Sequence, residues 1–267
     1  MAEKKEHKIV SADTGEEMTA ADIAEAKEKA KEHKIVEAAP VGNATAYRAG
    51  AIGLWVLAIV FEVLALLVLL GKINLHFLPT LWQLIIFLVL DLAAVIAGSQ
   101  LWKKANHIKP ASEKNKVLFW LWNNMGVIVA CIAFIPLIIL ILINKDIDKK
   151  TKVIATVVAI IALLIGGAAS IDYNPVSQEQ LVAAQETLAD ENVYWTRFGG
   201  VYHTHEDCYH LNRSDTLVTG TVEQAIAAKK TRLCKNCATL DDITGIETDN
   251  AAVDEAAIQE LEESLGD

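Results

Sequence analysis

The chain contains four long apolar stretches, and these constrain its fold more than any other feature. They comprise residues 49–70, 81–102, 117–143 and 151–170, and short polar stretches separate them. A helix needs about 20 mostly apolar residues to cross the roughly 30 Å hydrocarbon core of a bilayer, and each stretch is long enough. A soluble bundle would need a polar face along each helix, which these stretches lack. The sequence therefore predicts a four-helix transmembrane bundle embedded in a lipid bilayer.

The segments on either side of the bundle are polar and charged. Residues 1–48 form a charged N-terminal tail, and residues 241–267 form an acidic tail with ten Asp and Glu but no Lys or Arg. The acidic tail accounts for the formal net charge of −10, so the rest of the chain is neutral on balance. This charge distribution argues against a nucleic-acid partner, because phosphate binding requires a surplus of Lys and Arg.

Four spans place both termini on the same side of the membrane. Residues 1–40 lack the apolar core of a signal peptide, so the first span is expected to direct membrane insertion. Lys and Arg close to the membrane mark its cytoplasmic side. Eight lie on the side of the termini and five on the opposite side, which predicts a plasma-membrane protein with both termini in the cytoplasm. The eight are Lys31, Lys34, Arg48, Lys103, Lys104, Lys109, Lys114 and Lys116, and the five are Lys72, Lys145, Lys149, Lys150 and Lys152.

The N-terminal tail contains a short repeat. Residues 5–10 and 31–36 both read Lys-Glu-His-Lys-Ile-Val. Between the copies, Thr19 and Asp22 can cap a helix that runs to about Lys34. Two copies are fewer than the three or more units that a repeat fold requires. The repeat is therefore either incidental to a solvated helix or a two-copy docking peptide for a partner, and the sequence leaves both interpretations open.

Two carboxylates lie inside the apolar stretches, Glu62 in the first and Asp91 in the second. A charged group there costs roughly 2.5–3.5 kcal/mol on insertion scales, so such a residue usually has a partner or a function. Their distances along the chain from the loop at 71–80 predict similar depths in the membrane. They are therefore expected either to form hydrogen bonds between helices or to bind a cation or a proton.

Small residues recur at four-residue spacing in the fourth stretch. Ala155 and Ala159 form one such pair, and Ala162 and Gly166 form another. Small side chains let helix backbones approach closely in a membrane. The pattern is compatible with packing inside the bundle and with a homo-oligomer.

The strongest chemical signal follows the bundle, in residues 191–240, which a polar linker helix at 171–190 precedes. The pattern His-x4-Cys-x25-Cys-x2-Cys offers three thiolates and one imidazole, which is a closed tetrahedral ligand set for zinc. The predicted ligands are His203, Cys208, Cys234 and Cys237, with His205 as an alternative to His203 and His210 as a more distant one. A disulfide would leave one of these three cysteines unpaired.

Strand and helix signals surround the predicted zinc ligands. Residues 193–197 and 201–202 read as strands around Gly199 and Gly200, which is typical of a β-hairpin, and residues 222–229 read as a helix. The fold class is therefore mainly α: a transmembrane four-helix bundle with a small C-terminal zinc-bound ββα module.

A closed four-ligand zinc site has no open position for a catalytic water. The sequence therefore favours a non-enzymatic membrane protein that presents a zinc-stabilised module as a binding or scaffold surface, with a protein partner at the module or the tails. One alternative is a small ion- or proton-coupled transporter or channel subunit that uses Glu62 and Asp91. A second is a thiolate-based metal enzyme that acts through Cys208, Cys234 or Cys237.

Residues 190–240 also resemble a known family. The run from Val193 to His203, Cys208, the helix at 225–228 and the Arg-Leu-Cys-Lys-Asn-Cys segment at 232–237 look like the small metal-binding domain of the Ada DNA-repair proteins. They also resemble related zinc modules appended to bacterial nucleases and to bacterial membrane proteins. The resemblance covers about a fifth of the chain. It implies a zinc ion held between a β-hairpin and a helix with its Cys-x-x-Cys turn.

The resemblance does not extend to the alkyl-transfer chemistry of Ada, in which all four ligands are Cys. Here the first ligand is His203, and residues 190–240 contain six Lys and Arg against six Asp and Glu. That balance lacks the positive surface that a DNA backbone requires.

Overall fold

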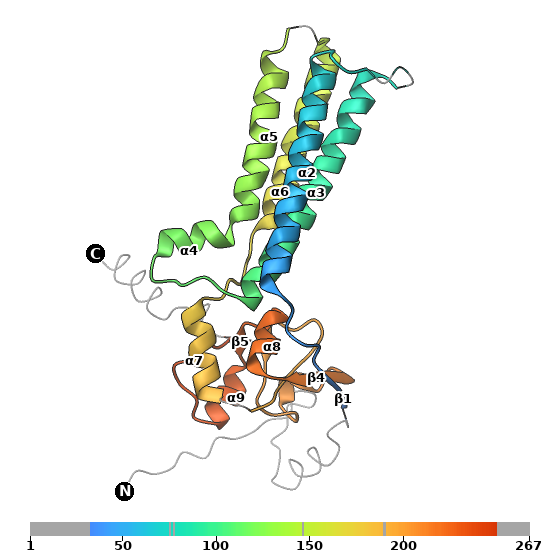
Figure 1. The fold of residues 1–267 in the computed structure, drawn as a ribbon. Helices are drawn as coiled ribbons and strands as arrows, with labels where there is room; N and C mark the ends of the chain where they lie inside the picture. Colours follow the sequence, from blue (N-terminus) through green and yellow to red (C-terminus); the bar gives the residue numbers. More distant parts are fainter. Residues whose placement is uncertain (1–32, 75, 77, 146, 189–190, 250–267) are drawn as a thin grey trace, which may run out of the picture.

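The computed structural model describes residues 33–249, apart from residues 75, 77, 146 and 189–190. The protein is mainly helical. Four long helices lie side by side in an elongated bundle, and a smaller domain with short strands sits at one end of it (Figure 1). All four are long and apolar enough to cross a membrane, which confirms the predicted number of spans. They are α2 (Ala44–Leu69), α3 (Thr80–Ile108), α5 (Met125–Ile143) and α6 (Lys149–Ser170).

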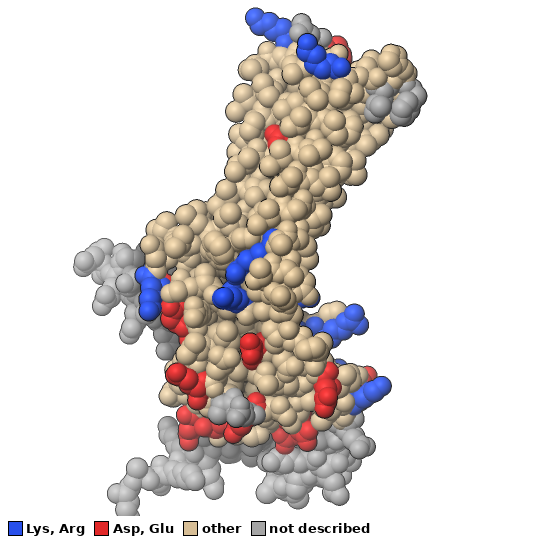
Figure 2. Space-filling view, viewed as in Figure 1, with Lys and Arg blue, Asp and Glu red and all other residues tan. Residues whose placement is uncertain are grey.

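The bundle core combines alanines with a few large apolar side chains, and many further branched aliphatic residues face outward. Phe134 and Leu137 of α5 are fully buried, whereas Val56, Val89 and Leu164 are half exposed or more. Figure 2 shows that charged residues gather at the two ends of the bundle and that its middle is almost free of them. Apolar side chains that face outward along the whole helix length suit a lipid environment, since exposing them to water would be unfavourable.

The small residues of α6 pack inside the bundle. Ala155, Ala159 and Gly166 are buried. A Cβ atom added at Gly166 would lie 3.1 Å from a methyl carbon of Leu92 on α3 and 3.6 Å from the ring of Phe134 on α5. The small-residue pattern therefore serves close packing within one chain.

The third apolar stretch is divided into two helices, which differs from the single span expected at 117–143. Helix α4 (Lys116–Asn123) is capped by Asn124, and α5 begins at the next residue, Met125. The backbone carbonyl of Trp122 accepts hydrogen bonds from Trp102 Nε1 at 2.8 Å and from Asn106 Nδ2 at 3.3 Å, both on α3. These side chains hold the carbonyl of the last α4 turn against α3. The chain can then change direction, so α4 points away from the bundle axis (Figure 1).

Helix α3 is longer than the apolar stretch from which it was predicted. It continues to Ile108, so the first half of the polar segment expected as a loop at 103–116 is helical. On this extension, Lys103 Nζ donates to the carbonyls of Ala169 at 2.8 Å and Ile171 at 3.2 Å, and His107 lies 3.0 Å from Asp172. These buried polar contacts fasten the end of α6 to α3, directly next to the smaller domain.

The smaller domain contains helix α7 (Gln178–Leu188), within the expected linker helix, and two small sheets rather than one hairpin. Strands β2 (Val193–Trp195) and β4 (Thr216–Gly220) are antiparallel, while β3 (Val201–Tyr202) and β5 (Arg232–Leu233) are parallel. The expected hairpin survives only as one isolated bridge between Tyr194 and His203. Helix α8 (Val222–Ala227) is two residues shorter than predicted and contacts α3. A short 3-10 helix, η1 (Tyr209–Leu211), and helix α9 (Lys235–Leu240) complete the domain.

The first sheet also contains a strand from the N-terminal tail. Strand β1 (Lys34–Glu37) pairs in parallel with β4, giving the strand order β1-β4-β2. The helix predicted to run to about Lys34 is not seen at its end, because His33 is not helical and Lys34 lies in this strand; residues 19–32 lie outside the described part. Propensity could not reveal this strand, because its partner lies 182 positions further along the chain (Lys34 to Thr216).

The start of the acidic tail belongs to the domain as well. Leu233 N donates to the Glu247 carbonyl at 2.9 Å, and Asp249 N donates to the Leu233 carbonyl at 3.1 Å. Ile243 and Ile246 pack against the domain core. The domain thus extends to Asp249, nine residues beyond the predicted boundary at 240, and residues 250–267 of the tail lie outside the described part. Below, "the module" means β1 together with residues 193–249.

Candidate metal centre

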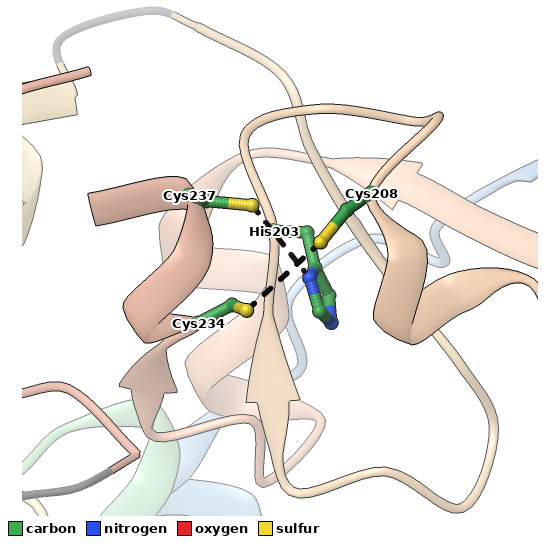
Figure 3. Close-up of side chains that lie close together, drawn as sticks. All are labelled: His203, Cys208, Cys234 and Cys237. Atoms are coloured by element: carbon green, nitrogen blue, oxygen red, sulfur yellow. Dashed lines mark hydrogen bonds between the residues drawn. The ribbon is translucent and has the colours of Figure 1, made fainter. Parts of the chain in front are cut away.

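The structure brings four metal-ligating side chains of the module together at one point. One ligand atom from each of His203, Cys208, Cys234 and Cys237 lies within 4.8 Å of every other (Figure 3). The sulfur atoms of Cys208 and Cys234 are 4.0 Å apart, and Cys237 Sγ lies 3.7 Å from His203 Nδ1. All four residues are buried, with at most 3% of their surface exposed.

The parallel pairing of β3 with β5 positions two of these ligands. His203 directly follows β3, and Cys234 directly follows β5. Because Tyr202 pairs with Leu233, and Cys234 N donates to the Tyr202 carbonyl at 2.9 Å, the next residues of both strands emerge at the same end. The second sheet therefore serves as a platform for half of the ligand set.

Short helices position the other two ligands. Cys208 immediately precedes η1, and Cys237 lies in the first turn of α9, which begins just after Cys234. One helical turn separates the two cysteines of the Cys-x-x-Cys segment, so both sulfur atoms can face the same point. Figure 3 shows the four side chains pointing toward one another.

The distances fit a tetrahedral metal. With Zn–S bonds of about 2.3 Å and a Zn–N bond of about 2.0 Å, tetrahedral geometry gives S···S separations of about 3.8 Å and S···N separations of about 3.5 Å. The separations of 4.0 Å and 3.7 Å exceed these by about 0.2 Å. Since all the ligand atoms lie within 4.8 Å of one another, the cluster could hold a metal ion if its side chains moved closer together.

Hydrogen bonds to the sulfur atoms shift the pKa values of the cysteines in the cluster. The pKa of Cys237 lies well below its ordinary value, chiefly because the Cys208 thiol donates a hydrogen bond to its sulfur. Burial opposes this shift, whereas hydrogen bonds from His203 and from the N–H groups of residues 204 and 205 lower the pKa further. Burial raises the pKa of Cys234, and the N–H groups of Asn236 and Cys237 oppose that rise. Backbone donors aimed at the sulfur atoms are a feature of thiolate metal sites, since they stabilise negative charge on the ligands.

The two other candidate histidines are not part of the cluster. The Nε2 atom of His205 forms a 2.7 Å hydrogen bond with Asp241 Oδ1, and its side chain is 42% exposed. His210 lies on η1 and is exposed. Of the histidines that the sequence left open, the structure therefore places only His203 next to the three cysteines.

Glu62 and Asp91 are both buried inside the bundle, Glu62 on α2 with 8% exposure and Asp91 on α3 with 1%. Among the described residues, neither carboxylate oxygen of Asp91 has a hydrogen-bond partner, and the hydroxyl of Thr156 on α6 is also buried without one. Hydrogen bonding between helices, which is one of the two roles expected for this pair, is thus not seen for Asp91.

Sequence reasoning missed the polar junction between bundle and module. Lys103 and His107 face the end of α6, where they contact Ala169, Ile171 and Asp172. Burial would raise the pKa of Asp172, but the hydrogen bond and charge of His107 bring it below the ordinary value. A signal was present, since Lys103 and His107 are four residues apart and share one face of a helix. The prediction of a loop at this point concealed that spacing.

Comparison with known proteins adds no family, because no protein-family model, curated protein or solved structure matches the chain. The function therefore has to be argued from the residues themselves.

Proposed function

We propose that the chain is a multi-pass protein of the plasma membrane whose zinc-stabilised module is a non-enzymatic binding surface on the cytoplasmic side. The proposal combines three arguments: the donor set of the cluster, its burial, and the way in which the module displays one aromatic side chain.

Zinc is the metal that best suits the donor set. Three thiolates and one imidazole are soft ligands at tetrahedral spacing, which favours zinc over calcium, magnesium or manganese. The four ligands would hold the ion between the β3–β5 sheet and α9. The Ada-like spacing of the last three ligands supports the same metal.

The burial of the ligands supports a structural role and disfavours a thiolate enzyme. A catalytic zinc keeps one position open for water or substrate, whereas four protein ligands fill a tetrahedral zinc. A thiolate that attacks a substrate must be accessible, and Cys208, Cys234 and Cys237 are buried beneath the module surface. A zinc ion bound here would thus serve to hold the β3–β5 sheet, η1 and α9 together.

A fixed loop on the module displays Phe198 to solvent, and this observation carries the binding proposal. Phe198 is 91% exposed, and the guanidinium of Arg197 lies 5.5 Å from the centre of its ring. The loop behind it is held firmly: buried Lys230 donates to the carbonyls of Arg197 and Gly199, and Thr231 N donates to the Gly200 carbonyl at 3.2 Å. Aromatic residues and Arg are enriched at protein interfaces, so this exposed ring beside an arginine supports a protein-binding surface.

The cytoplasmic orientation rests on the count of eight Lys and Arg near the membrane on one side against five on the other. The sheet formed by β1 and β4 supports placing the N-terminal tail and the module on a common side, since the two strands are hydrogen-bonded. Figure 2 shows Lys and Arg side chains at the junction of bundle and module, where cytoplasmic headgroups would lie.

Site-specific photocrosslinking in cells tests the binding proposal. A photoreactive amino acid at position 198 should give a discrete crosslinked protein, because the loop presents that side chain. The matched control is position 240, since Leu240 is an exposed apolar residue of the same module, 64% exposed. Crosslinking at 198 should disappear when Cys234→Ser removes a ligand and should persist in Cys131→Ser, which changes the bundle cysteine. Equal, diffuse crosslinking from 198 and 240 would contradict a specific surface.

The transporter alternative is favoured by one observation, the unpartnered carboxylate of Asp91 at 1% exposure. Buried ionisable groups in membrane helices commonly mark ion or proton paths. Flux measurements on the protein in sealed vesicles separate the two functions: uptake or a pH-dependent current lost in Asp91→Asn and Glu62→Gln supports transport, and absence of flux in the unaltered protein supports the binding function.

A further inference from the structure

The N-terminal repeat extends over eight residues if one mismatch is allowed. Residues 5–12 read Lys-Glu-His-Lys-Ile-Val-Ser-Ala, and residues 31–38 read Lys-Glu-His-Lys-Ile-Val-Glu-Ala. The two octamers differ only at their seventh position. The second octamer contains β1 and the residue that follows it. The first octamer lies outside the described part of the chain.

The second octamer binds β4 mainly through its backbone. Lys34 N donates to the Asp215 carbonyl at 2.9 Å, and Ala38 N donates to the Thr219 carbonyl at 2.8 Å. At the start of the octamer, His33 Nδ1 lies 2.7 Å from the Ser214 carbonyl oxygen. Backbone pairing of this kind is strand addition, in which the main chain supplies affinity and a few side chains supply selectivity.

The side chains that select this strand are present in both octamers. Ala38 lies close to the end of β4, where a Cβ atom added at Gly220 would be 2.8 Å from Ala38 Cβ, and the first octamer has Ala12 at the corresponding position. His33 corresponds to His7. The position that differs, Glu37, is an exposed strand residue. Residues 5–12 therefore carry the same residue types as residues 31–38 at every position except this exposed one.

We propose that residues 5–12 are a second ligand for the β4 edge and that they compete within one chain with residues 31–38. In the bound form Lys8 pairs with Thr216, Ile9 with Leu217, Val10 with Val218 and Ser11 with Thr219, in the parallel register of β1. The module then has one strand-binding site and two strands of the same chain to fill it.

Linker length sets the balance between the two strands. Residues 39–43, five in number, separate the second octamer from α2, whereas residues 13–43, thirty-one in number, separate the first. Effective concentration falls roughly as the −3/2 power of linker length, which favours the second octamer by about 15-fold if both strands bind equally well. The first octamer would then occupy β4 in about one chain in 16, consistent with β1 being the strand observed.

Strand-specific proline variants of the full chain, at one chain per lipid nanodisc, test the competition. Alternation along β1 gives Val36 the same orientation as Lys34 and Ala38, so Val36→Pro removes a backbone donor to β4. In Val36→Pro, hydrogen exchange at residues 216–220 should accelerate by no more than about 15-fold, because the first octamer takes over. Val10→Pro alone, the matched control, should change nothing, and the double variant should exchange far faster than either single variant.

Exchange in Val36→Pro that already equals that of the double variant would overturn the proposal. Protection in Val36→Pro that is present in crowded vesicles but absent at one chain per nanodisc would also overturn it, because the strand would then come from a second copy. A second measurement does not depend on how the proline variants fold: a photoreactive amino acid at position 10 should crosslink to residues 216–220 with about one-fifteenth of the yield from position 36. No such crosslink from position 10 would refute competition in the unaltered fold.

Discussion

Replacing Cys234 by Ser should weaken zinc binding and destabilise the module while leaving the bundle intact. Metal binding and folding are coupled in small zinc modules, and structural zinc contributes about 10–16 kcal/mol at pH 7. That exceeds or matches the 5–15 kcal/mol by which a typical domain is stable, so the module should not survive complete removal of zinc.

The magnitude for one ligand follows from the closed four-ligand geometry. If the four ligands share the binding free energy about equally, loss of one thiolate removes roughly 2.5–4 kcal/mol, which weakens zinc binding about 60- to 700-fold. Cys234 sits directly after β5 and is 1% exposed, so water cannot easily replace its sulfur. Serine should therefore act as a missing ligand.

The assay uses the full chain in detergent, with zinc titrated against a chromophoric chelator and hydrogen exchange followed in α9. The unaltered protein should hold about one zinc, and both Cys234→Ser and chelation should expose the α9 amides. Cys131→Ser serves as the control, because Cys131 lies on α5 of the bundle. Unchanged zinc affinity in Cys234→Ser, or full protection of α9 after chelation, would refute the reasoning.

Three further predictions concern the bundle, the junction and the orientation. Gly126→Ala should destabilise the bundle by about 1–3 kcal/mol in detergent unfolding, because its Cβ would overlap a serine hydroxyl of α3, whereas Gly167→Ala, with open space around it, should be neutral. The pKa of Asp172 is lowered, despite burial, by hydrogen bonding to a histidine of α3, so the stability that this carboxylate contributes should be complete at neutral pH and lost as the pH falls below 3.8, the ordinary pKa of Asp. Asp172→Asn should remove that pH dependence from acid unfolding curves. A membrane-impermeant thiol reagent should label a cysteine introduced at Asn74 in intact cells but not one introduced at Glu247; the opposite pattern would place the module outside the cell.

Local patterns were enough to predict the features that depend on neighbouring residues. Continuous apolar stretches were enough to predict the four long helices, because a lipid-exposed backbone has to satisfy its own hydrogen bonds. The spacing of Cys234 and Cys237 is also local, since one helical turn brings them together. The sequence could not decide between His203 and His205 on the same basis. That choice depends on the pairing of Tyr202 with Leu233, two residues far apart in the chain.

Two of the features that sequence reasoning missed depend on distant contacts. The division between α4 and α5 requires side chains of α3 that reach the Trp122 carbonyl. Strand β1 contains Ile35 and Val36, which suit a strand, but their polar neighbours are equally typical of a solvated helix. Only the edge of β4 makes the extended conformation favourable. Tertiary contacts thus overrode weak local preferences at both places.

The pairing of β1 with β4 also has a consequence for biosynthesis. Strand β1 leaves the ribosome before any membrane helix, yet its partner is made only after all four, about 10–40 s later at 5–20 residues per second. Until then the apolar side chains of Ile35 and Val36 have no sheet to join. A chain that inserted an odd number of helices would hold β1 and β4 on opposite sides of the bilayer, and the bare β4 edge would be a site for proteolysis or aggregation. The β1–β4 pair can therefore form only in chains whose helices are inserted so that both strands lie on the same side of the bilayer.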